Sequence, residues 1–176
     1  DGDTNIAIGL AALGTGDVAG AGNIGIGASA LAAVTSGTNN IAIGLTAADA
    51  MTDNLDNIAI GRLALSASAN DADCNIAIGV AAMGLTDVSG LSNVAIGSNT
   101  MDALTSGACN IAIGKAALGA STTGCNNVAL GLNTMGVAIT TGVDNIAMGQ
   151  GASKNLTSGG YNIGIGYQAG DAVTTT

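Results

Sequence analysis

Few side chains in this 176-residue chain could carry out chemistry. The chain has neither His nor Glu, so all 12 acidic residues are Asp, and its only cations are Arg62, Lys115 and Lys154. Its Ser and Thr residues occur in turn-like segments, and the chain has no His that would activate one of them as a nucleophile. We therefore expect no enzymatic activity and no catalytic residue.

Two pairs of aspartates are the candidates for a metal site. Asp53 with Asp56, and Asp71 with Asp73, occur in predicted return loops, where carboxylates and carbonyls can hold Ca²⁺. They do not recur at one repeat position, so we interpret them as solvated loop acids and expect no metal. Segment 14–20 is rich in Gly like a phosphate-binding loop, but it lacks the terminal Lys, and we expect no cofactor.

The three cysteines are candidates for a structural role. Cys109 and Cys125 occupy neighbouring repeats, where they could form a disulfide within the chain or with another chain. Cys74 lies two repeats before Cys109, about 9.6 Å away, which is beyond the reach of a disulfide. The odd count leaves Cys74 as a free or intermolecular thiol.

The charge of the chain limits its partners. A formal net charge of −9 disfavours nucleic acid and anionic membrane surfaces, since both attract Lys and Arg. The apolar stretch 18–34 is too short and too rich in Gly for a membrane span. We expect neither nucleic-acid binding nor membrane insertion.

A repeat extends through the whole chain. Ten copies of a pentapeptide, Asn, aliphatic, Ala or Gly, aliphatic, Gly, begin 17 or 18 residues apart. The chain is therefore one repeat domain, residues 1–176. Its units begin at Asn5, Asn23, Asn40, Asn57, Asn75, Asn93, Asn110, Asn127, Asn145 and Asn162.

The repeat predicts an all-β fold. The unit is too short for paired helices, and the alternation of Ile6 and Ile8 with small residues has the period of a strand. The Gly after the strand permits a corner, and we expect a second short strand around Ala12 and Leu13. The prediction is a parallel β-solenoid, or β-roll, of about ten 17–18-residue coils, in which the Asn side chains bond to one another as a structural ladder.

The same alternation assigns the two faces of each strand. We expect the aliphatic columns that begin at Ile6 and Ile8 to form the interior. The third position of the pentapeptide is always Ala or Gly, which predicts close approach by another part of the coil, another chain or ordered water. The candidate interface residues in this column are Ala7, Ala42, Ala59, Ala77, Ala95, Ala112, Ala129 and Ala147.

Four segments carry a resemblance to a known family: 40–44, 57–61, 110–114 and 162–169. Their Asn-x-Ala-Ile-Gly pattern and its variants resemble the head repeats of trimeric autotransporter adhesins and similar tracts in phage tail fibres. The resemblance implies a left-handed parallel β-roll, assembled as a trimer or fibre. It also implies an extracellular, cell-surface or virion location, a structural or adhesive role and a host surface receptor as a partner.

Two functions remain open from the sequence. The first is a structural fibre component that associates with itself side by side and end to end, because the first and last units are as apolar as the inner ones and have no caps. The alternative is an ice-binding solenoid that presents a flat face of small residues to ordered water.

Overall fold

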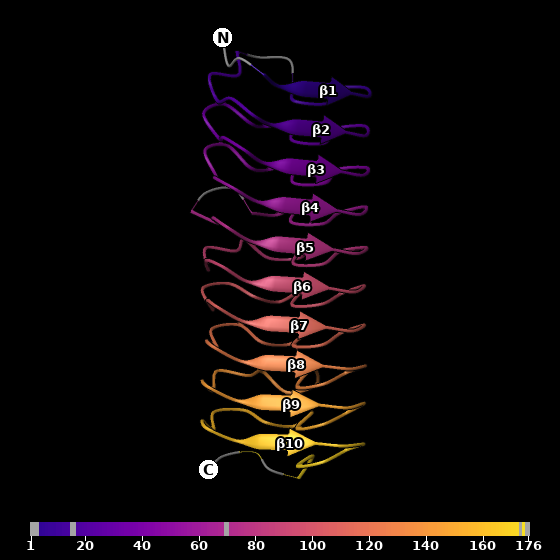
Figure 1. Cartoon of the computed structure of the whole chain (residues 1–176), viewed down its shortest axis with the longest axis vertical. Helices are drawn as coiled ribbons and strands as arrows, with labels where there is room; N and C mark the ends of the chain where they lie inside the picture. Colours follow the sequence, from indigo (N-terminus) through magenta and orange to yellow (C-terminus); the bar gives the residue numbers. More distant parts are fainter. Residues whose placement is uncertain (1–3, 15–16, 69–70, 173, 175–176) are drawn as a thin grey trace.

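The computed structural model describes residues 4–14, 17–68, 71–172 and 174, in which ten short parallel strands form a β-solenoid (Figure 1). Coil n denotes the coil that contains strand βn. The strands are β1 (Ile6–Ile8), β2 (Ile24–Ile26), β3 (Ile41–Ile43), β4 (Ile58–Ile60), β5 (Ile76–Ile78), β6 (Val94–Ile96), β7 (Ile111–Ile113), β8 (Val128–Leu130), β9 (Ile146–Met148) and β10 (Ile163–Ile165). The described residues include no helix, and hence none that could cross a membrane.

Each strand pairs in parallel with the strand of the next coil, in the order β1 to β10. The register places equivalent residues opposite one another, as in the pairs Ile41↔Ile58 and Ala42↔Ala59. Backbone hydrogen bonds continue beyond the strands, where Gly27 N–H donates to the Ile8 carbonyl at 2.7 Å. The predicted solenoid, with one strand in every repeat, is confirmed.

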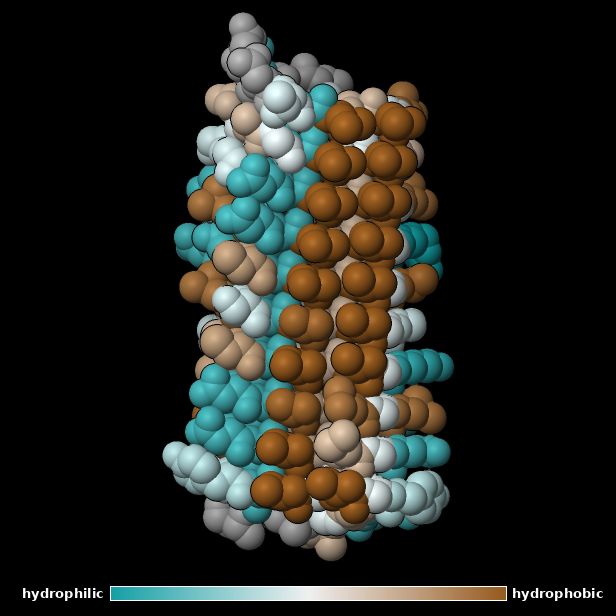
Figure 2. All heavy atoms as spheres, viewed as in Figure 1, coloured by the Kyte–Doolittle hydropathy of each residue, from teal (hydrophilic) through white to brown (hydrophobic). Residues whose placement is uncertain are grey.

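The assignment of the two strand faces from the sequence was wrong. Ala42, Ala77 and Ala112 are 0% exposed, whereas Ile111 and Ile113 are 41% and 42% exposed. None of the aliphatic residues at the strand ends is buried. The aliphatic columns face outward over the length of the rod (Figure 2), and the alanine column forms part of the interior.

The narrow interior explains why the alanine column faces inward. A Cβ placed on Gly25, in this column, would lie only 3.3 Å from Leu13 Cγ and 3.2 Å from the Ala30 carbonyl oxygen. The close approach that the sequence predicted therefore comes from the opposite arm of the coil. In the inner coils this column is not an interface with another chain, while Ala7, in the first coil, is exposed.

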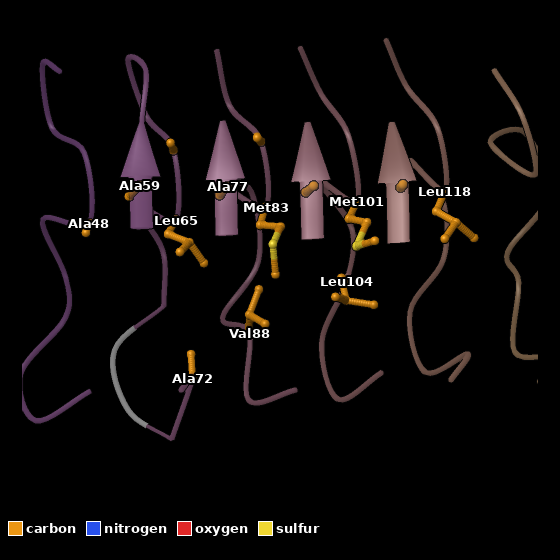
Figure 3. Close-up of a cluster of buried hydrophobic side chains, with 14 of the residues drawn as sticks. Ala48, Ala59, Leu65, Ala72, Ala77, Met83, Val88, Met101, Leu104 and Leu118 are labelled. Atoms are coloured by element: carbon orange, nitrogen blue, oxygen red, sulfur yellow. The ribbon is translucent and has the colours of Figure 1, made fainter. Parts of the chain in front are cut away.

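Large side chains fill the interior from the opposite arm. Leu65, Met83, Met101 and Leu118 are fully buried and lie in a row beside the strands, where the Ala59 and Ala77 side chains are also drawn (Figure 3). A second row contains Val88 and Leu104. One small residue opposite one large residue fills the space between the two arms, as close packing of a protein interior requires.

The second strand predicted around Ala12 and Leu13 is absent, because this arm consists of turns. Leu63 and Leu65 have φ values of 62° and 50°, and equivalent positions in the other coils also have left-handed φ. The strand is followed by a Gly such as Gly61, whose φ is 132° and whose Cβ would lie 2.5 Å from the Gly79 carbonyl oxygen. The corner thus requires Gly for both its conformation and its space.

Substituting Ala95 with Leu tests which face is interior. The added atoms would enter a filled space, so we expect the free energy of unfolding to fall by about 1–3 kcal/mol. Urea unfolding followed by circular dichroism measures this change. The matched control is Ala28→Leu, at an outward position where Leu45 and Leu132 occur in other coils. Equal stability of the two variants would contradict the assignment of the alanine column to the interior.

Candidate interaction surface

The most prominent surface of the rod is a double column of outward-facing aliphatic side chains, exposed or half-buried, which we name the isoleucine stripe (Figure 2). It contains the first and third residues of every strand. These are Ile6, Ile8, Ile24, Ile26, Ile41, Ile43, Ile58, Ile60, Ile76, Ile78, Val94, Ile96, Ile111, Ile113, Val128, Leu130, Ile146, Met148, Ile163 and Ile165.

Strand geometry positions the stripe. Alternate residues of a strand point to opposite faces, so the inward alanine places both of its neighbours outward. Parallel pairing in register then repeats this arrangement in every coil, as in the pairs Ile76↔Val94 and Ile78↔Ile96. Because monomeric proteins rarely expose contiguous apolar patches of more than a few hundred Å², the stripe is the candidate functional site of this chain.

Two columns of mixed polarity border the stripe. The upstream rim consists of the residue before each repeat Asn: Thr4, Gly22, Asn39, Asp56, Cys74, Ser92, Cys109, Asn126, Asp144 and Tyr161. The downstream rim consists of the residue after each corner Gly: Leu10, Ala28, Leu45, Arg62, Val80, Ser98, Lys115, Leu132, Gln150 and Tyr167. In Figure 2 both rims are seen beside the stripe as side chains of varying hydropathy.

The asparagine column lies beneath the upstream rim and is a buried hydrogen-bond ladder. Asn110 donates from Nδ2 to Asn93 Oδ1 at 3.0 Å and to the Gly124 carbonyl at 2.7 Å. Its own Oδ1 accepts the backbone N–H of Asn127 at 2.9 Å. The predicted side-chain ladder is confirmed, and the same amides also join the return loop to the strand.

Cys109 and Cys125 form no disulfide within the chain, in which all three cysteines are free thiols, and a disulfide with another chain stays a prediction. The two residues occupy different positions in their coils. Cys109 has a φ of 58°, and its counterpart in the next coil is Asn126, with a φ of 56°, rather than Cys125. Cys125 Sγ instead accepts the Ala108 backbone N–H at 3.4 Å.

Of the aspartates considered as calcium ligands, Asp56 and Asp73 accept hydrogen bonds within the chain. Asp56 accepts the side-chain amide of Asn39 at 3.1 Å, and Asp73 accepts the backbone N–H of Leu55 at 2.7 Å. Among the described residues, no three His, Cys, Asp or Glu side chains lie close enough together to hold a metal ion. That the chain binds no metal stays a prediction. Residues 15 and 16 of the Gly-rich segment 14–20 lie outside the described residues.

Two partly buried carboxyl groups differ from ordinary surface acids. Burial raises the pKa of Asp102 above its usual 3.8, although a hydrogen bond from Asn99 opposes this shift. Burial raises the pKa of Asp49 in the same direction. Neither residue adjoins a cleft, because the described part of the chain contains no pocket.

Comparisons with protein-family models, curated proteins and solved structures find no match for this chain. The left-handed winding and the trimer that the resemblance implies therefore stay predictions.

The exposed stripe was missed by reasoning from the sequence, although a signal for it was present. The third position of the pentapeptide never exceeds Ala in size, while the ninth position of most units is Leu or Met, as in Leu65 and Met83. A coil that buries the large ninth residue has room only for the small third residue beside it. This pairing of sizes indicates that Ala, and not Ile, faces inward.

Asn110→Ala tests the ladder. The substitution leaves Asn127 N–H and the Gly124 carbonyl without this partner, whereas Asn93 Oδ1 still accepts the backbone N–H of residue 110. Each unsatisfied buried group costs about 1–3 kcal/mol, so we expect a loss of more than about 2 kcal/mol in urea unfolding. The control Asn155→Ala removes one partly buried amide bond, to the Asp171 carbonyl, and should cost about 0.5–1.5 kcal/mol. Similar losses in both variants would contradict the special role of the ladder.

Asp102→Asn tests the effect of burial on the carboxyl. A raised pKa in the folded state means that ionised Asp102 destabilises the fold, and that this cost disappears as the pH falls through the raised pKa. Because the group is partly solvated, we expect the variant to be more stable at pH 7 by less than about 1 kcal/mol. The difference should vanish near pH 3, as thermal melts at both pH values can show. A variant less stable than the parent at pH 7 would contradict this sign.

Proposed function

We propose that this chain is a non-enzymatic structural component of an extracellular or virion fibre, in which copies associate side by side through the isoleucine stripe. The observation that carries the proposal is the outward face of the stripe along all ten coils, where none of its residues is buried and nine are exposed. Covering apolar surface contributes about 25 cal/mol for each Å² removed from water. A long and regular apolar face thus favours a long and regular contact.

The shape of the stripe suits another rod better than a small ligand. Small molecules bind in concave pockets that bury most of their surface. The stripe instead extends over the strands from β1 to β10, and a second solenoid offers an apolar face of the same length and repeat. Side-by-side association of copies is therefore the partner arrangement we propose.

The end-to-end part of the proposal depends on the outermost strands. Among the described strands, β1 and β10 are each paired on one side only. An unpaired strand edge is a template for another strand, so a further coil of a longer chain or of a neighbouring subunit can continue the sheet. Residues 1–3, 175 and 176 lie outside the described residues.

An adhesive role toward a host surface receptor remains part of this proposal, supported by the resemblance of the repeats alone. The observation that favoured the ice-binding alternative, a flat surface of small residues, does not hold in the structure. Its flat face of small residues was the alanine column, and Ala59, Ala95 and Ala129 are buried inside the coil.

Replacing part of the stripe tests the side-by-side contact. Ile111→Ser with Ile113→Ser removes two exposed apolar side chains from β7. We expect the self-association constant, measured by analytical ultracentrifugation, to fall at least about tenfold, which corresponds to about 1.4 kcal/mol.

The matched control is Val137→Ser with Ile139→Ser, since these side chains are 59% and 62% exposed but lie outside the stripe. Their replacement should leave association unchanged, and circular dichroism should show both double variants folded. A parent chain that stays monomeric at all concentrations tested would overturn the proposal. Equal association of the parent and the stripe variant would also overturn it.

A further inference from the structure

The isoleucine stripe by itself does not specify how two copies align. Every coil presents nearly the same pair of aliphatic side chains, so a copy shifted by one coil, about 4.8 Å, still places Ile against Ile. A copy that binds in the antiparallel orientation also places aliphatic side chains against aliphatic side chains. If the stripe covers a second copy, as the proposed function holds, then the alignment must be set by residues at its borders.

The two rims carry opposite charges. On the downstream rim the charged residues are Arg62 and Lys115, both exposed, and neither has an ion-pair partner within the described chain. The charged residues of the upstream rim are Asp56 and Asp144. Asp56 is exposed and accepts an amide hydrogen bond from Asn39, which neutralises no charge. The remaining cation, Lys154, pairs with Asp171 at 3.4 Å, away from both rims.

Symmetry determines which rims meet. Copies related by rotation about an axis parallel to the rod place the upstream rim of one copy beside the downstream rim of the next, at the same coil. Copies related by a two-fold axis perpendicular to the rod place like rims together. In a fully overlapped antiparallel pair of that kind, the first coil faces the tenth and the fourth faces the seventh.

The charges favour the first arrangement. In a parallel pair, Arg62 in coil 4 lies level with Asp56, which borders the same strand on the other rim. In the antiparallel pair, Arg62 instead faces Lys115, which lies in coil 7. An exposed ion pair adds little affinity, and its main effect is to select orientation and register.

We propose that a second copy of this chain binds to the isoleucine stripe in parallel and in register, and that the opposite charges of the two rims select this alignment. The apolar stripe supplies the affinity and the rims supply the specificity. The inference rests on the proposed self-association, and it holds for any number of copies arranged around an axis parallel to the rod.

Disulfide trapping with Cys74 as a native probe tests the orientation. Cys74 and Val80 lie on opposite rims of coil 5, at the two sides of β5. A strand rises about 3.3 Å per residue, so the strand and its two flanking residues separate them by more than the limit of about 7 Å for a disulfide within one chain. The parallel probe is Val80→Cys with Cys109→Ser and Cys125→Ser. Mild oxidation at a concentration where the parent associates should give a disulfide between Cys74 of one chain and the thiol introduced at position 80 of another.

A second set of substitutions reports the antiparallel alternative. Leu45→Cys and Leu132→Cys, with all three native cysteines replaced by Ser, place thiols on the downstream rim in coils 3 and 8. These coils face each other only in the antiparallel pair, and within one chain they are about 24 Å apart. We expect at least tenfold more interchain product from the parallel probe, measured by non-reducing electrophoresis and peptide mass spectrometry.

Exchange of charges tests the role of the rims. Arg62→Asp in the parallel probe places two acids at the same contact and should lower the yield of the interchain disulfide severalfold. Adding Asp56→Arg restores opposite charges and should restore the yield.

Failure of this rescue would overturn the role of the charges, and a dominant disulfide between the thiols introduced at positions 45 and 132 would overturn the parallel alignment. In both cases, ultracentrifugation that still shows association leaves the proposed function intact. A monomeric parent chain would overturn both proposals.

Discussion

The narrow space between the two arms of each coil is the constraint on which the rest of this structure depends. The strand approaches the opposite arm so closely that its inward position accepts only Ala or Gly, since a Cβ placed on Gly25 would already lie 3.3 Å from Leu13 Cγ. The large buried residues, such as Met101 and Leu118, come from the turn-rich arm. Since each strand has one inward residue and two outward residues, the aliphatic residues with the highest β propensity are left on the surface.

Hydrogen bonds of the asparagine ladder hold successive coils together and fix the return loop of each coil against its strand. The buried asparagines join each coil to the next and also hold the return loop, as Asn110 does through Gly124. No buried side-chain polar atom of the described residues lacks a hydrogen bond. The turn-rich arm contains left-handed residues in every coil, including bulky ones such as Leu65. Such conformations are costly for non-glycine residues, and the repeated contacts between coils offset that cost.

The surface that results has an aliphatic stripe of nearly constant composition and two rims whose residues differ from coil to coil. The stripe is nearly identical in every coil, and this favours a long contact without specifying its register. The rims vary from coil to coil and place Arg62 and Asp56 on opposite sides of the same strand. In the assembly that we propose, burial of the apolar stripe stabilises the contact, and the charges on the rims select the relative orientation of the copies.

The sequence by itself determined the repeat, the strand in each unit, the parallel solenoid and the asparagine ladder, because ten copies of one pattern allow only one register. The alternation alone did not determine which strand face is interior, since it has a period of two and is the same whether Ile6 or Ala7 points inward. It also misplaced the arm around Ala12 and Leu13, where local propensity allows a strand but coil closure requires left-handed turns. Only the tertiary structure decided these points, because the distance between the two arms depends on how the whole coil closes.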